Sequence, residues 1–229
     1  MASIAITAIS DPVCPFCYIA LLRLNRALTL FRKTVPGAST TPLTISWHAY
    51  QLDPSAPRRT SQPWAAKAAQ RRGADRVPAL QKQLRDVGMR EGVPFDFDCK
   101  IGNTIEAHRL VVLARKRDPA GTRELEHRVT QEMMQVYFEE GGDITSTEDL
   151  VRAAKRAGLD GDEARAWLEG DEGLEEVQRE VDEAVKMGIE GVPRFVINDK
   201  FVVEGADDVG VFFEQLVLAK EALDQVEMQ

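Results

Sequence analysis

Cysteine and histidine are both scarce in this chain of 229 residues, which contains three of each. Three cysteines are too few for the disulfide framework of a small secreted scaffold, and they fit a reducing compartment. Two of them, Cys14 and Cys17, have the two-residue separation that also begins many zinc sites, but such a site needs two further ligands. No remaining candidate has the spacing of a zinc ligand pair: Cys99, His48, His108 and His127. We therefore expect no bound metal or other cofactor.

Long hydrophobic runs are missing as well. No stretch of about 18 apolar residues occurs, so no transmembrane helix is predicted. The apolar N-terminal stretch lacks a basic leader and is interrupted by Ser10-Asp11-Pro12, so no signal peptide is expected and the cytoplasm is the default location. The 29 Lys and Arg residues are outnumbered by 37 Asp and Glu residues, giving a formal net charge of -8. This balance argues against a nucleic-acid or anionic-membrane partner.

The sequence Cys14-Pro15-Phe16-Cys17 is the most informative feature that is present. It follows a β-rich run, Ile4 to Ile9, and leads into a stretch with helical spacing of apolar residues from Phe16 to about Phe31. Two thiols at a strand-to-helix junction can exchange between dithiol and disulfide, and a helix start stabilises a thiolate. Proline fits this position because the first helical N–H groups have no intrahelical partner. The motif favours redox chemistry.

The rest of the chain predicts an α/β fold whose sheet is divided in the sequence. Alternation predicts a second strand over residues 41–50, and strand character returns at 194–198 and 201–203 before a last helix capped by Asp207 or Asp208. Residues 62–188 have the composition of a helical block. Neither end has enough strands for a sheet, so we expect residues 1–61 and 189–229 to form one domain, with 62–188 inserted as a helical domain.

Capping signals divide the helical block into helices. Asn103 to Glu106 is an N-cap pattern for a helix through about residue 116, and Thr145 to Glu148 reads as a capping box for a helix ending before Gly158. Residues 160–163 can start a third helix. A fourth amphipathic helix is expected over residues 173–187.

Four segments together resemble a known family. They are Ser10-Asp-Pro-Val-Cys-Pro-Phe-Cys-Tyr18, Asn103-Thr-Ile-Glu-Ala-His-Arg-Leu110, Tyr137-Phe-Glu-Glu140 followed by Asp143-Ile144, and Gly188-Ile-Glu-Gly-Val-Pro-Arg-Phe-Val-Ile-Asn198. The chain is similar over nearly its whole length to thioredoxin-fold proteins of the DsbA-like type, and within them to the FrnE-like oxidoreductases. The resemblance implies a thioredoxin fold interrupted by a large all-helical insertion.

The resemblance also implies roles for individual residues. Cys14 corresponds to the nucleophilic thiol, Cys17 to the resolving thiol, and Pro193 to a cis-proline that faces the disulfide. The backbone of Val192 is then expected to pair with an extended peptide or thiol substrate, as a strand does at a sheet edge. With the two residues between the cysteines, Pro15 and Phe16, it forms part of the expected substrate-binding site.

Asn103, Thr104 and His108 allow two interpretations. The resemblance implies that this helix start faces the two cysteines and helps to form the substrate pocket. Alternatively, Asn103 only caps the helix and His108 is an ordinary partly buried residue. We include all three among the candidate substrate-binding residues.

Other residues are interpreted as structural. Cys99 is expected to be a lone packed or surface thiol, because it has no cysteine partner nearby in the sequence. Asp11 is interpreted as a turn residue rather than a charge near the thiols, and Arg71-Arg72 as part of a solvated helix face. The three tryptophans are expected to fill the core or an interface: Trp47, Trp64 and Trp167.

The leading functional hypothesis is a thiol–disulfide oxidoreductase that acts by mixed-disulfide exchange on protein or small-molecule thiols, with glutathione as a candidate co-substrate. The alternative is a glutathione-dependent transferase or isomerase, similar to the kappa-type transferases or the aromatic-carboxylate isomerases, including a tailoring enzyme of secondary metabolism. A third hypothesis is a chaperone-like interaction module with an apolar groove in its helical block. The sequence leaves the direction of exchange open, and it is compatible with a monomer or a homodimer.

Overall fold

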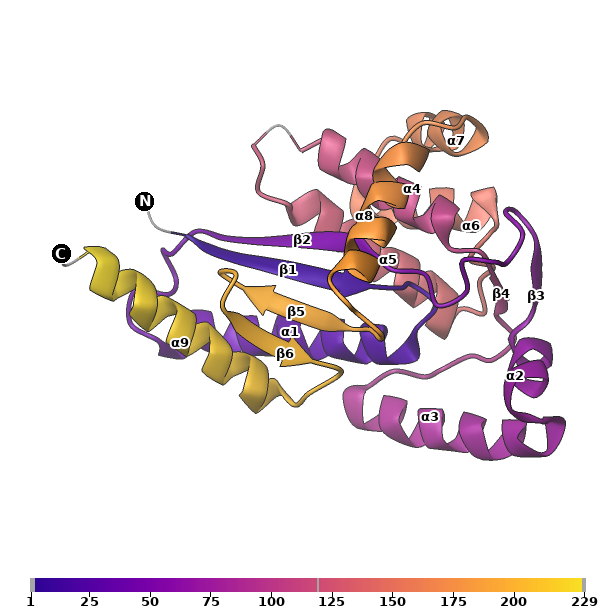
Figure 1. Ribbon diagram of the computed structural model, residues 1–229, viewed down its shortest axis with the longest axis horizontal. Helices are drawn as coiled ribbons and strands as arrows, with labels where there is room; N and C mark the ends of the chain where they lie inside the picture. Colours follow the sequence, from indigo (N-terminus) through magenta and orange to yellow (C-terminus); the bar gives the residue numbers. More distant parts are fainter. Residues whose placement is uncertain (1–2, 119, 228–229) are drawn as a thin grey trace.

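The protein is built on one four-stranded mixed sheet, seen in a computed structural model that describes residues 3–118 and 120–227. The strand order is β2-β1-β5-β6, with β1 parallel to β2 and antiparallel to β5 (Figure 1). These strands are β1 (Ile4–Ser10), β2 (Leu43–Ala49), β5 (Arg194–Ile197) and β6 (Phe201–Glu204). The two ends of the sequence thus share one sheet, as predicted.

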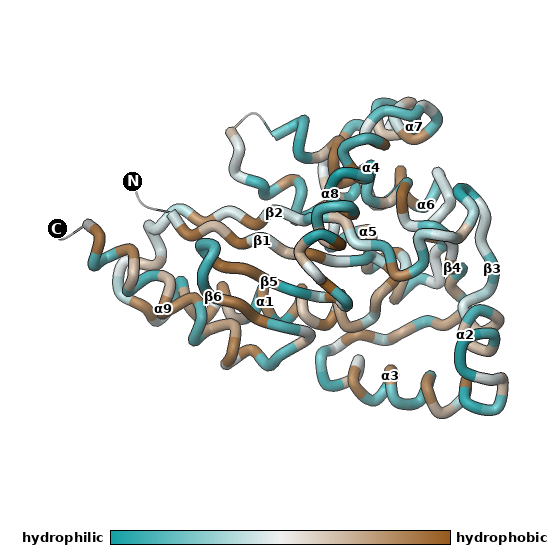
Figure 2. The backbone as a smooth tube through the Cα atoms, viewed as in Figure 1, coloured by the Kyte–Doolittle hydropathy of each residue, from teal (hydrophilic) through white to brown (hydrophobic). Residues whose placement is uncertain are grey.

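Apolar side chains on the sheet pack against the first and last helices, α1 (Pro15–Thr34) and α9 (Val209–Glu227). Phe195 of β5 meets Phe212 of α9 edge-on, with ring centroids 5.0 Å apart. Figure 2 shows hydrophobic residues along β1 and β5, whereas α2 and α8 carry mostly hydrophilic residues. The sheet therefore forms the centre of the core and fixes the end of β1, from which the chain enters the two-cysteine motif.

The segment between β2 and β5 is mainly helical, as the sequence predicts. It contains α2 (Trp64–Arg72), the 3-10 helix η1 (Ala74–Arg76), α3 (Val77–Glu91), α4 (Ile105–Lys116), α5 (Glu124–Glu139), α6 (Thr147–Ala157), α7 (Gly161–Glu169) and α8 (Leu174–Lys186). Two three-residue strands, β3 (Ser61–Pro63) and β4 (Lys100–Gly102), form an antiparallel ribbon that the sequence did not predict. Strands this short give no detectable alternation.

An α/β fold with a helical insertion is therefore the architecture of this chain. The division at residues 61/62 and 188/189 stays a prediction. The outermost residues of the expected sheet domain, 1–2 and 228–229, lie outside the described residues. Across residues 3–118 and 120–227, no helix is both long enough and apolar enough to cross a membrane.

One predicted helix cap was wrong by one residue. The cap of α6 is Ser146, whose side chain accepts a hydrogen bond from the Asp149 N–H, and not Thr145. Thr145 instead donates its backbone N–H and its hydroxyl to the Asp143 carboxylate, at 2.9 and 2.8 Å. A sequence with successive Ser and Thr residues offers overlapping capping boxes, and the Asp143 contacts select between them.

Candidate functional site

Cys14 is the N-cap residue of α1, and Cys17 lies in the first turn of that helix. Pro15 occupies the first helical position, where its missing N–H leaves no hydrogen bond unmade. Cys14 is 5% exposed as a residue, and Cys17 is fully buried. Both cysteines are in the thiol form. The helix start therefore presents one thiol near the surface and keeps the second beneath it.

The two thiols differ in acidity. The pKa of Cys14 is lowered, first by a hydrogen bond from the Cys17 thiol and then by the backbone N–H groups of Cys17 and Phe16, which outweigh the effect of burial. Burial and the neighbouring Cys14 sulfur raise the pKa of Cys17. A thiolate is the nucleophile in disulfide exchange. The geometry thus makes Cys14 the more acidic of the two thiols.

The loop before β5 contacts the motif from the other side. The Val192–Pro193 peptide bond is cis, as the resemblance implied. The Cys14 thiol lies 3.7 Å from the Val192 carbonyl oxygen, to which it can donate. Both loop residues line a shallow cavity of about 400 Å³ whose walls include Gly188, Gly191 and Gly205.

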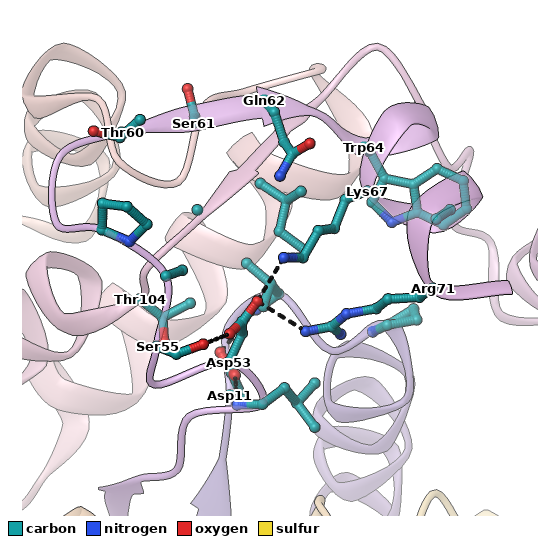
Figure 3. Close-up of a pocket in the computed structure, with 18 of the residues that line it drawn as sticks. Asp11, Asp53, Ser55, Thr60, Ser61, Gln62, Trp64, Lys67, Arg71 and Thr104 are labelled. Carbon is teal, nitrogen blue, oxygen red and sulfur yellow. Dashed lines mark hydrogen bonds and ion pairs between the residues drawn. The ribbon is translucent and has the colours of Figure 1, made fainter.

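A second cavity, of about 480 Å³, lies beside the motif between the start of α1, the loop after β2, and α2 (Figure 3). Its volume is in the range of pockets that bind small molecules. The residues on each side of Cys14, Val13 and Pro15, both line it. Its apolar wall includes Trp64, Leu80 and Ile101.

Charged side chains gather on the α2 side of this larger cavity. Asp53 lies at the centre of Figure 3 and pairs with Lys67 at 2.7 Å and with Arg71 at 3.1 Å. The Ser55 hydroxyl donates to the same carboxylate at 2.8 Å. Arg72 also lines the cavity. The interpretation of Arg71-Arg72 as a solvated helix face was therefore incomplete, since both side chains form part of the cavity wall.

Asp11 lies at the bottom of the same cavity and is almost completely buried. Its carboxyl group accepts hydrogen bonds from the backbone N–H groups of Leu52 at 2.7 Å and Val13 at 3.3 Å. Burial nevertheless raises its pKa to about 7. In its ionised form this carboxylate raises the pKa of Cys14. Asp11 forms the turn that the sequence indicated and is also a charge near the thiol, which the sequence interpretation did not favour.

The remaining candidate substrate-binding residues fall into two groups. Thr104 lines the larger cavity, and Phe16 is 42% exposed next to Cys14. Asn103 and His108 do not line either cavity. Asn103 accepts from Gln51 at 2.7 Å and donates to the Ala56 carbonyl at 2.7 Å.

His108 is buried and lies 3.0 Å from the Tyr50 carbonyl oxygen. Burial lowers its pKa to about 4, so its ring is neutral at pH 7 and donates from Nε2 to that carbonyl. Both Asn103 and His108 thus hold the loop of residues 50–56, which forms one wall of the larger cavity. Their direct part in substrate binding stays untested.

Sequence reasoning missed most of the polar residues in the larger cavity. Asp53 and Lys67 had no signal in the sequence, because they come together only when the loop after β2 meets α2. Trp64 was expected to fill the core, and it does so while one face lines the cavity. Cys99 is buried, as expected for a packed thiol, and burial raises its pKa to about 11. Among the described residues, no group of three or more His, Cys, Asp or Glu side chains is placed to hold a metal ion.

Comparison with known proteins agrees with this geometry. Residues 5–217 match the DSBA-like thioredoxin domain. The chain belongs to the DSBA-like thioredoxin domain family. A search of curated protein sequences returned no match.

Solved structures of other DSBA-like and related proteins share this fold. A probable DsbA oxidoreductase from Streptomyces coelicolor is 26% identical, with a TM-score of 0.80 over 95% of this chain and 90% of that one. The cytosolic disulfide reductase DsbM from Pseudomonas aeruginosa, solved with GSH, is 18% identical, with a TM-score of 0.57 over 98% of this chain and 100% of that one. A 2-hydroxychromene-2-carboxylate isomerase is 15% identical, with a TM-score of 0.62 over 98% and 99%.

Proposed function

We propose that this protein is a thiol–disulfide oxidoreductase that acts through Cys14 and Cys17. The observation that carries the proposal is the division of acidity between the two thiols, with the pKa of Cys14 lowered and that of Cys17 raised. Such a pair supplies one thiolate for attack and a second thiol that reacts only after the first has formed a bond. Membership of the DSBA-like family supports the same chemistry.

The reaction has two steps when the dithiol form meets a disulfide substrate. The Cys14 thiolate attacks one substrate sulfur, the substrate S–S bond breaks, and the departing thiolate takes up a proton. The Cys17 thiol then loses its proton and attacks the Cys14 sulfur, which releases the second substrate thiol. The substrate gains two electrons, and the protein ends with a Cys14–Cys17 disulfide. The same two steps in reverse oxidise a substrate dithiol.

Two molecules of glutathione can return the disulfide form to the dithiol by the same exchange, leaving glutathione disulfide. DsbM was solved with GSH, and this supports glutathione as a co-substrate here. DsbM is also described as cytosolic, which fits our expectation of a cytoplasmic, FrnE-like enzyme. No bound cofactor takes part. In this proposal the Val192 carbonyl, which lies 3.7 Å from the Cys14 sulfur, and the exposed Phe16 side chain contact an incoming thiol or peptide, a role that the resemblance implies.

Trapping the mixed disulfide tests the mechanism. Cys17→Ser should accumulate a covalent adduct between Cys14 and a substrate thiol, because no second thiol can resolve it, and Cys14→Ser should lose exchange activity. Mass spectrometry after acid quench measures both. Cys99→Ala is the matched control, and we expect it to exchange like the wild type since its thiol is buried outside the motif. Exchange that survives in Cys14→Ser would contradict the mechanism.

A glutathione-dependent transferase or isomerase is the second candidate. The larger cavity favours it, because about 480 Å³ beside Cys14 can hold a small organic molecule. That chemistry needs glutathione and one reactive thiol or hydroxyl at the helix start, and it does not need Cys17. Turnover of an aromatic carboxylate with glutathione that persists in Cys17→Ser would favour this candidate over the oxidoreductase.

A further inference from the structure

The charge of the larger cavity is opposite to that of the whole protein. The chain has a formal net charge of -8, yet three cations line the cavity, against two carboxyl groups. The cations are Lys67, Arg71 and Arg72, and the acids are Asp11 and Asp53. The raised pKa of Asp11 leaves that group largely protonated below pH 7. The cavity therefore attracts anions, in contrast to the remaining surface.

Asp53 shows how this cavity holds a carboxylate. Its side chain lies between Lys67 and Arg71 and accepts from the Ser55 hydroxyl. These contacts keep the pKa of Asp53 below its usual value, with Lys67 the largest cause. Arg72, by contrast, makes no ion pair with any of the described residues. Lys67 and Arg71 are thus already paired with a carboxylate of the protein, whereas Arg72 is available to a ligand.

The apolar side chains of the cavity indicate what else a ligand should carry besides an acidic group. Trp64, Leu80 and Ile101 contribute apolar side chains to the same cavity that Asp53 and Lys67 line. A planar or compact apolar group can pack against these side chains while an acidic group meets the cations of α2, Lys67, Arg71 and Arg72. Because Val13 and Pro15 flank Cys14, the sulfur of such a molecule would lie toward the start of α1.

The reactive thiol is also poorly accessible to a large partner. Cys14 is only 5% exposed, so a folded protein must present a flexible segment to reach it, whereas a small molecule can approach it from the cavity that its neighbours Val13 and Pro15 line. We propose that this enzyme prefers small thiols and disulfides that combine an aromatic or compact apolar body with a carboxylate. This inference rests on the proposed oxidoreductase function and specifies its substrate class.

Two matched disulfides test the preference. One is dithiobis(nitrobenzoate), which has a carboxylate on each aromatic ring, and the other is its uncharged bis-carboxamide. The reduced protein attacks either probe through Cys14 and releases one coloured aromatic thiol, and Cys17 then releases the second. The probe gains two electrons and the dithiol becomes a disulfide. Single-turnover rates at increasing probe concentration give the half-saturating concentration, and we expect a lower one for the carboxylate probe.

Two substitutions should change this selectivity in opposite directions. Arg72→Ala removes the unpaired cation, and it should reduce the preference for the carboxylate probe about threefold, as expected for one partly exposed charge. Asp53→Asn removes the internal carboxylate and frees Lys67 and Arg71, so it should increase the preference by a similar factor. Arg90→Ala is the control, since Arg90 is an exposed arginine on α3 that does not line the cavity.

The outcomes separate this inference from the proposed function. If neither probe oxidises the Cys14–Cys17 pair, the oxidoreductase function fails and the inference fails with it. If both probes oxidise the pair with equal half-saturating concentrations, the function stands and the preference for carboxylates is overturned. Equal effects of Arg72→Ala and Arg90→Ala would also overturn it, because the effect would then come from overall charge and not from the cavity.

Discussion

At the scale of single residues, a buried acid lies close enough to the reactive thiol to influence its pKa. Asp11 sits three residues before Cys14, and its ionised form opposes the thiolate. The backbone hydrogen bonds that Asp11 accepts are not enough to keep it ionised at low pH, because burial dominates its pKa. The ionisation state of Asp11 is therefore one of the influences on how easily Cys14 ionises near pH 7, after the hydrogen bond from Cys17 and the effect of burial.

Asp11→Asn should lower the apparent pKa of Cys14 below that of the wild type, since it removes a negative charge near the thiolate. The rate of alkylation by iodoacetamide, measured against pH, gives this value. Asp86→Asn, at an exposed site on α3 where the acid pairs with Lys82, is the control and should leave the profile unchanged. An unchanged or higher Cys14 pKa in Asp11→Asn would contradict this account of the thiol's acidity.

The raised pKa of Asp11 also predicts how the stability of the protein depends on pH. Its pKa is about 7 in the folded protein and 3.8 when unperturbed, so the folded state holds a proton that the unfolded state loses between these values. The contribution of Asp11 is therefore complete below pH 3.8 and declines as the pH rises through 7. The free energy of unfolding of the wild type should fall relative to Asp11→Asn between about pH 4 and pH 7 and level off above that range, as measured by urea denaturation. A constant difference would contradict the raised pKa.

The position of the two thiols at a helix start could be predicted from the sequence, whereas the larger cavity could not, and the difference has a physical reason. Cys14, Cys17 and Pro15 belong to one local motif whose geometry follows from a helix start. The ion pair between Asp53 and Lys67 depends instead on how the irregular loop after β2 packs against α2. The hydrophobic periodicity of the sequence does not predict such a contact. Asp11 was interpreted as a turn residue because its neighbours Ser10 and Pro12 are common in turns, and nothing local showed that its carboxyl would be buried.

At the scale of elements, the outer edge of β2 is closed by carboxylates from two helices. Glu126 of α5 accepts the Trp47 N–H at 2.6 Å, and Glu180 of α8 accepts the Ala49 N–H at 2.9 Å. Glu126 is completely buried and also pairs with Arg115 at 3.0 Å and Arg123 at 3.1 Å. These contacts satisfy backbone groups that an edge strand otherwise leaves open. They connect the helical insertion to the sheet.

Glu126→Ala should therefore cost about 1–3 kcal/mol of unfolding free energy, because it leaves the buried Trp47 N–H without an acceptor, whereas Arg115 keeps its ion pair with Glu180. Urea denaturation measures the loss. Glu124→Ala, two residues earlier on the same helix and exposed, should cost much less. If the two variants were equally stable, the buried carboxylate would not be what connects α5 to β2.

Element types were largely predictable, whereas the contacts between elements were not. The strands at 4–10, 43–49, 194–197 and 201–204 follow predicted alternation or β-branched content. The cap of α6 shifted from Thr145 to Ser146 because Asp143, outside the helix, binds Thr145. The ribbon of β3 and β4 escaped prediction since its strands are three residues long.

At the scale of the whole molecule, one core spans the sheet and the inserted helices. Tyr18 of α1 stacks on Phe138 of α5 with ring centroids 5.5 Å apart, and Phe95, in the chain after α3, meets Phe138 at 5.4 Å. The expected division at residues 62 and 188 therefore crosses a continuous apolar cluster. Apolar side chains from each part are buried against the other part.

A shared core predicts a single cooperative unfolding transition in urea. In a Trp64→Phe/Trp167→Phe variant, Trp47 is the remaining tryptophan and its fluorescence reports on the sheet, whereas most of the circular dichroism comes from the helices. The two signals should give the same midpoint. Two separate midpoints would show instead that residues 62–188 unfold as an independent domain.

The central claim is that Cys14 and Cys17 form a working redox couple. Its most direct test is a glutathione redox titration, read by mass spectrometry after acid quench and alkylation of free thiols. We predict a cooperative two-electron transition with one midpoint, whose potential will place the protein among reductants or oxidants. A glutathione adduct that persists at Cys14, or the lack of any defined midpoint, would contradict the claim and favour glutathione-dependent transfer or isomerisation.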